Sequence, residues 1–258
     1  SIENNVEEFS PNQITSELQS IVSADTSISI IVNVVSEDIY KLKAVATGIA
    51  NQLTANRNYY CHSLAQYYFW PDNHATQMDN LEGNNGVDWD YVVIGADPYI
   101  ISKMPGYYSL GVNKIVDKVI KGGAKPLLLM EWMNDSTLTN HFEEFTYRAA
   151  DGSKSPIQVI PGGLAWNALP SNLKDVAPVH PTPNGAYLAA ASIYSHIYSR
   201  SAAFSLYNYN DTIANVAQTT VVNSVSQTHY TGSPTFISPF KNCGVTHLNL
   251  IYNHQGTS

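Results

Sequence analysis

The chain has 258 residues, a formal net charge of −8 at pH 7, 13% charged residues and seventeen tyrosines. A chain of this length can bury the core of one large domain without a metal or a disulfide. The acidic balance argues against nucleic acid and anionic membranes as partners. A surface poor in charge and rich in Tyr, Asn, Ser and Thr favours an extracellular protein that contacts neutral, sugar-like ligands.

Neither a membrane span nor a metal site is predicted. No apolar run approaches the roughly 20 residues that cross a bilayer, and the eight histidines are scattered without metal-ligand spacing, so we expect no cofactor. Residues 1–5 do not resemble a signal peptide, so we expect the mature form of a secreted or periplasmic protein whose leader has been removed. In such a compartment Cys61 and Cys243 would form a disulfide, and two buried thiols are the alternative.

The first part of the chain predicts a lead-in helix and then a strand–turn–helix unit. Residues 1–26 are polar apart from a weakly amphipathic run, which indicates a short helix. Residues 28–35 are β-branched and almost wholly apolar, as in a strand of a parallel sheet that is buried on both faces. Helical periodicity follows over residues 39–53, and residues 59–68 resemble a second strand.

The middle of the chain alternates strands with helices. Strands are predicted at 90–95, 126–130 and 157–160, and helices at 110–120, ended by Gly122 and Gly123, and at 142–150. This alternation predicts a flavodoxin-like, three-layer α/β/α domain with a mostly parallel central sheet.

The domain is predicted to span residues 27–204, after the lead-in at 1–26. Beyond it the composition changes to an Asn-, Thr- and Val-rich stretch and then a Gly-, Pro- and Ser-rich one, before a last strand at 248–252. We therefore predict a C-terminal extension, residues 205–258, that packs on the domain.

A proline-stiffened loop presents one histidine ahead of an Ala-rich helix. Pro181 and Pro183 each fix φ, and we expect Asn184 to cap a helix that begins directly after it and runs to about Ser199. His180 is thereby held at the mouth of that helix, a position suited to acid–base chemistry. A loop histidine that only packs is the alternative.

The segment His180-Pro-Thr-Pro-Asn-Gly-Ala-Tyr-Leu-Ala-Ala resembles the histidine block of the SGNH (GDSL-type) esterases and lipases. The similarity spans residues 27–200 and implies the three-layer fold of that family and a Ser-His-Asp site in which His180 is the general base. The family carries Asp three residues before its histidine. That position is Ala177 here, and the nearest acid, Asp175, is the predicted third member.

Ser36 is the predicted nucleophile because it follows the first buried strand and precedes a helix whose N-terminus would favour an alkoxide. The family has Gly before this serine, whereas Val34 and Val35 stand here, and Ser36 as a plain helix N-cap is the alternative. Ser258 is a second candidate for the nucleophile, because it ends a Gly-x-Ser sequence that follows the strand predicted at 248–252.

The run Gly95-Ala96-Asp97-Pro98 stands where the family carries its Gly-x-Asn-Asp oxyanion block. Gly95 can donate its N–H, whereas Asp97 is either part of the substrate site or the first residue of a turn. Trp166 is predicted among the aromatic residues that line a sugar-binding cleft, with core packing as the alternative.

Ligands of such sheets bind beyond the carboxyl ends of the strands, so Ser36, Gly95, Asp97, Glu131 and His180 are expected to converge there. We predict a secreted ester hydrolase that acts on an acylated carbohydrate or a similar neutral ester. The alternative is a catalytically inactive member of the same fold that binds glycans or sits at a cell surface, favoured by the changed Gly and Asn blocks.

Overall fold

A computed structural model describes residues 11–25, 81–83, 89–95, 101, 105–133, 136–155, 157–175, 182–205, 207 and 209–230. The elements are α2 (Pro11–Ala24), β1 (Tyr91–Ile94), α7 (Pro105–Lys121), β2 (Lys125–Leu129), α8 (Ser136–Asp151), β3 (Gln158–Ile160), α9 (Gly162–Ala168), η3 (Ser171–Leu173), α10 (Pro183–Tyr198), η4 (Ala202–Phe204) and α11 (Asp211–Ser224). The predicted strands at 28–35, 59–68 and 248–252, the predicted helix at 39–53 and both cysteines lie outside the described residues.

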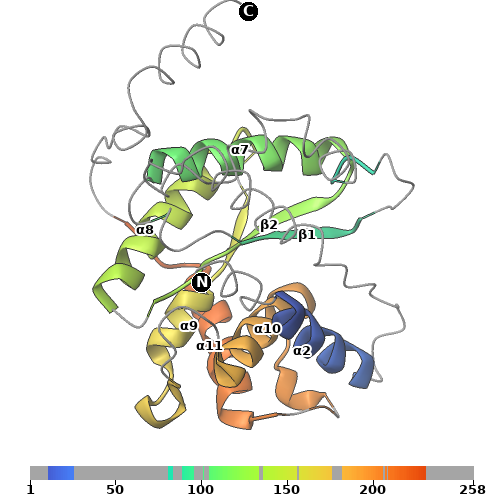
Figure 1. Ribbon diagram of the computed structural model, residues 1–258, viewed down its shortest axis with the longest axis vertical. Helices are drawn as coiled ribbons and strands as arrows, with labels where there is room; N and C mark the ends of the chain where they lie inside the picture. The colour runs from blue at the N-terminus through green and yellow to red at the C-terminus, as the bar shows by residue number, and fades with distance from the viewer. Residues whose placement is uncertain are drawn as a thin grey trace, which may run out of the picture.

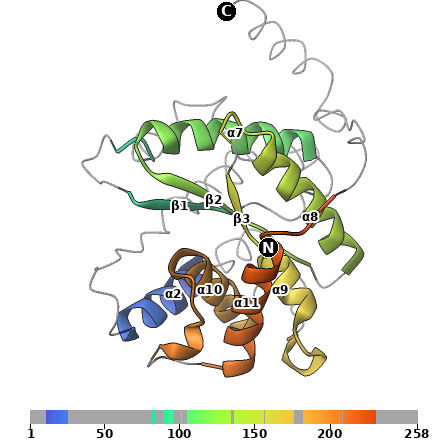
Figure 2. The same cartoon turned by 180° about the vertical axis from the view of Figure 1, so that it is seen from behind.

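The three described strands form a parallel sheet in the order β1-β2-β3. Val93 is in register with Leu127, and Leu128 with Val159. Each predicted strand in this region is confirmed to within two residues. Helices lie on both sides of the sheet, with α7 and α8 on one side and α2, α9, α10 and α11 on the other (Figures 1 and 2). The described part of the chain is thus mixed α/β, as predicted.

The apolar run of β2 is buried on both faces of the sheet. Leu128 and Met130 belong to the cluster with α7 and α8, whereas Leu127 and Leu129 belong to the cluster with α9 and α10. Successive side chains of a strand point to opposite faces. A central strand covered by helices on both sides therefore needs an unbroken apolar sequence.

Helices α7 and α8 begin five and six residues before their predicted starts. The first turn of α7 is Pro105-Gly106-Tyr-Tyr, and that of α8 is Ser-Thr-Leu-Thr; both sequences have low helix propensity. Pro105 is tolerated there because the first turn needs no N–H donor. As predicted, α7 stops before Gly122 and Gly123, and Gly123 has a φ of 88°.

The helix in the C-terminal extension was not predicted. α11 contains Thr219, Thr220, Val221 and Val222 in succession, and such β-branched residues lower helix propensity. The helix is stabilised instead by its N-cap and by burial of one face. The N-cap is Asn210, whose side chain accepts hydrogen bonds from two backbone N–H groups at 3.0 and 3.2 Å. The buried residues are Ile213, Ala214, Ala217, Val221 and Ser224.

The lead-in helix α2, predicted from its weak amphipathic run, is held on α10 by buried polar contacts. Tyr194 Oη donates to Asp25 Oδ2, and Arg200 Nη2 lies 3.3 Å from the same oxygen. Burial and this hydrogen bond raise the pKa of Tyr194, so its hydroxyl stays protonated and donates. Ser205 Oγ adds a bond to the Ile21 carbonyl at 2.8 Å.

None of the helices in the described ranges is long and apolar enough to cross a membrane.

The start of α10 differs from the prediction that Asn184 is its cap. The N-cap is Thr182, whose Oγ1 accepts a hydrogen bond from Gly185 N at 3.2 Å, and Pro183 is the first helical residue. Proline favours this position because its fixed φ suits a helix and its missing N–H is not needed. The Asn184 side chain is therefore free to act elsewhere, and its Nδ2 donates to the Leu173 carbonyl at 3.0 Å.

Glu82 is expected to make stability depend on acid pH. Its side chain is buried, contacts Lys118, and lies 2.7 Å from Lys121 Nζ; these hydrogen bonds lower its pKa from 4.5 to about 2. Because the folded-state pKa lies below the unfolded one, this stabilisation is present above pH 4.5 and is lost as pH falls towards 2.

Both lysines are partly exposed to solvent, so we expect only about 1–2 kcal/mol from this cluster. Urea unfolding at pH 7 and pH 3 should show that difference in the wild type and a smaller one in Glu82→Gln. Equal pH dependence in the two proteins would contradict the assignment.

Candidate functional site

The carboxyl edge of the sheet brings together residues that follow the three strands. Gly95 follows β1 directly, Glu131 comes two residues after β2, and Gly162 comes two residues after β3. Because the strands are parallel and adjacent, these positions share one edge. Gly95 and Glu131 are thus where the sequence predicted them. Ser36, Asp97, His180 and Ser258 lie outside the described residues.

The segment after β2, residues 130–133, is fixed on several sides. Met130 N donates to the Ile160 carbonyl, and Gly163 N donates to the Met130 carbonyl, both at 2.9 Å. Thr139 Oγ1 donates to the Met133 carbonyl at 3.0 Å. These bonds tie the segment to β3, α9 and α8, so side chains on it have a rigid base.

Glu131 is buried, with 7% of the residue exposed. It lies close enough to Tyr108 of α7 to contribute to that residue's raised pKa, behind the larger effect of burial. Glu131 is therefore within electrostatic range of α7. Trp132, the next residue, packs with the cluster on the opposite side.

Trp132 and Trp166 stack with ring centroids 5.3 Å apart and an interplanar angle of 18°. Trp166, the predicted substrate-site residue, is only 4% exposed, so its ring is part of the core. Trp132 is half-buried. A β-carbon on Gly185 would lie 3.3 Å from Trp132 and 3.5 Å from Trp166, so the first turn of α10 packs against the edges of both rings.

The segment that carries His180 is bounded by residues that contact each other. Leu173, at the end of η3, accepts the hydrogen bond from Asn184 in the first turn of α10. Asp175 is exposed and lies two residues beyond Leu173. Asp175 and His180 therefore both belong to a stretch whose two ends are joined by a hydrogen bond.

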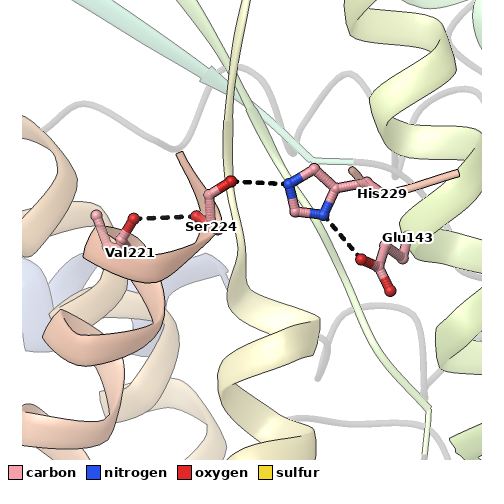
Figure 3. A network of polar contacts seen from close by, with 4 residues as sticks. All are labelled: Glu143, Val221, Ser224 and His229. Carbon is pink, nitrogen blue, oxygen red and sulfur yellow. Dashed lines mark hydrogen bonds and ion pairs between the residues drawn. The ribbon is translucent and has the colours of Figure 1, made fainter. Parts of the chain in front are cut away.

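A second group of Ser, His and Glu side chains lies at the end of α11 (Figure 3). His229 Nδ1 is 2.8 Å from Glu143 Oε1, and its Nε2 is 2.8 Å from the backbone carbonyl of Ser224. The ring stacks on Tyr147 with centroids 3.5 Å apart. Burial raises the pKa of Tyr147 to about 12, so that neighbour stays neutral.

This group contains the residue types of a catalytic triad but not the geometry. A general base needs a free ring nitrogen within reach of the nucleophilic hydroxyl. Here Nε2 meets a carbonyl oxygen, and Ser224 Oγ donates to the Val221 carbonyl at 3.0 Å (Figure 3). The arrangement therefore joins α8 to the end of α11 rather than activating Ser224.

The chain after α11 continues along α8. Tyr230 Oη donates to Asp151 Oδ2 at 2.6 Å, and the Arg148 guanidinium lies 4.1 Å from the Tyr230 ring centroid. Residues 225–230 thus cross from the α11 layer to the α8 layer (Figure 2). No local sequence pattern predicts the His229 contacts, because their partners are 86 and five residues away and belong to two helices.

Within the described ranges, no three His, Cys, Asp or Glu side chains are grouped so that they could hold a metal ion.

The chain was compared with protein-family models, with curated proteins and with solved structures, and none of them matches it.

Proposed function

We propose that the protein is a secreted or periplasmic SGNH-like hydrolase, with the three-layer α/β/α fold of that family, that cleaves an acylated carbohydrate or a similar neutral ester. The observation that carries the proposal is the bond from Asn184 to Leu173, which joins the ends of the segment holding Asp175 and His180. Leu173 therefore lies at the first turn of α10, and that turn packs against Trp132 at the carboxyl edge of the sheet, where ligands of such sheets bind.

The reaction assigned to the site is acyl transfer to a serine followed by hydrolysis. Ser36 Oγ attacks the ester carbonyl while His180 takes its proton, and Asp175 orients the imidazole. His180 then returns the proton to the leaving alcohol. Water repeats the sequence on the acyl-enzyme, releasing the acid and restoring Ser36. The Gly95 N–H is the assigned donor to the oxyanion in both steps.

A non-catalytic binding protein of the same fold is the second candidate. Asp97 stands where a neutral amide is expected, and a carboxylate there would repel an oxyanion. Ala177 likewise stands where the family carries its acid. Both departures weaken catalysis, but neither removes the aromatic residues at the carboxyl edge. They therefore fit a protein that binds sugars without cleaving them.

Covalent labelling separates these candidates and the two candidate serines. A fluorophosphonate phosphonylates the activated serine of such hydrolases with loss of fluoride, and peptide mapping then identifies that serine. We expect label on Ser36 and turnover of 4-nitrophenyl acetate, both lost in Ser36→Ala, with Ser258→Ala as the matched control that keeps both. Label on Ser258 would reassign the nucleophile. Absence of label and turnover in the wild type would favour the binding protein.

A further inference from the structure

Trp132 is half-buried and follows β2 at the carboxyl edge of the sheet. Tyr187, Tyr194 and Trp166 in the same cluster are at most 4% exposed. The α10 helix begins beside Trp132, and Thr182 is its half-buried cap. Trp132 therefore stands at the edge of the sheet where a substrate of the proposed reaction would enter.

The indole is held in one orientation before any ligand arrives. Trp166 supports one of its faces, and β-carbon positions on Gly162 and Gly185 lie 3.4 and 3.3 Å from its six-membered ring. Its backbone belongs to the segment fixed by the bonds of Met130 and Met133. A side chain ordered in this way loses little conformational entropy on binding, so stacking on it contributes almost in full to affinity.

The chemistry of this position favours a neutral ring with an apolar face. An indole offers a flat π surface, and Thr182 Oγ1, which accepts from Gly185 N, keeps its hydroxyl hydrogen for a ligand. The net charge of −8 disfavours anionic ligands. A pyranose has both features required, an apolar C–H face for the indole and hydroxyl groups for Thr182.

We propose that Trp132 is the stacking platform for the sugar ring of the substrate, with Trp166 as its support. This inference rests on the proposed function, because it assigns a specificity residue to that site.

Two esters test it: 6-O-acetylglucose, which carries a sugar ring, and 4-nitrophenyl acetate, which carries none. In Trp132→Ala we expect the ratio of kcat/KM for the sugar ester to that for the nitrophenyl ester to fall roughly tenfold, the size of a lost stacking contact. Trp132→Phe, which keeps a smaller ring and fills more of the space, should retain most of the ratio.

Phe204→Ala is the matched control. Phe204 is 76% exposed and belongs to η4, beyond the C-terminal end of α10, whereas Trp132 packs against the first turn of that helix. Its removal should leave the ratio unchanged. An unchanged ratio in Trp132→Ala would overturn the proposal.

A binding measurement keeps the two proposals separable. Glucose should quench the tryptophan fluorescence of the wild type and of Ser36→Ala, and Trp132→Phe should abolish the quenching. If the wild type hydrolyses neither ester but glucose quenching depends on Trp132, the hydrolase proposal fails and the platform stands. If glucose produces no quenching at any soluble concentration, the platform is wrong, whether or not the esters are cleaved.

Discussion

Replacing His180 with alanine is expected to lower the turnover of 4-nitrophenyl acetate by about 100-fold or more, the usual contribution of a general base. Without the imidazole, Ser36 keeps its proton and remains a weak nucleophile. The melting temperature should hardly change, because one loop side chain is expected to add little to the core. Turnover and thermal unfolding, measured on the same preparation, check both halves of this prediction.

His229→Ala is the matched control, because the two histidines are expected to show opposite effects. His229 bonds Glu143 and the Ser224 carbonyl and stacks on Tyr147. Its loss should cost about 2–3 kcal/mol, since it removes two partly buried hydrogen bonds, one of them to a carboxylate. For a chain of this size that corresponds to a melting temperature lower by roughly 4–10 °C. Turnover should be kept in this variant.

These measurements distinguish a catalytic role from a packing role for each of the two histidines. Full turnover in His180→Ala would refute the catalytic assignment, and a large fall in its melting temperature would favour a packing role for His180. Loss of turnover in His229→Ala, with the fold intact, would make the group at the end of α11 the catalytic one.

The largest effect on stability is expected from Gly163→Ala in α9. A β-carbon at this position would lie 2.5 Å from the Glu131 carbonyl oxygen and 2.8 Å from Met130 Cε. The methionine can move, but the carbonyl belongs to the segment that follows β2 and contacts α9, so the backbone must shift. We expect a loss of at least about 3 kcal/mol, a large part of the 5–15 kcal/mol that stabilises a typical domain. Urea unfolding gives the value.

Gly123→Ala separates steric overlap from backbone strain. Gly123 has a φ of 88°, but a β-carbon there would meet no atom within 4 Å. Its replacement should cost only the strain of a left-handed residue, about 1–2 kcal/mol. If Gly163→Ala and Gly123→Ala lose equal stability, steric overlap with the Glu131 carbonyl is not the reason that position 163 requires glycine.

The same shift should affect the carboxyl edge, because Gly163 N also donates to the Met130 carbonyl. Displacing this segment moves Trp132 relative to Trp166. In Gly163→Ala, the sugar-ester preference should therefore fall together with stability, whereas in Gly123→Ala it should not.

Local patterns by themselves determined much of the sheet and of the helices beside it. The unbroken apolar run from Leu127 to Met130 predicted a strand buried on both faces, and β2 is such a strand. The Ala-rich run after Pro183 predicted α10, which ends at Tyr198. These signals are strong because each is set by residues close in sequence, through strand alternation, helix propensity or a helix-ending glycine pair.

Tertiary contacts decided what the local sequence left open. α11 is helical despite its β-branched run, because one face packs on α10 and α9. The cap of α10 is Thr182 rather than Asn184, since Asn184 has a partner, Leu173, eleven residues back. Trp166 is core and Trp132 is half-buried because of where α9 and α10 meet. In each case the deciding neighbour is distant in the chain, so no short-range pattern encodes the contact.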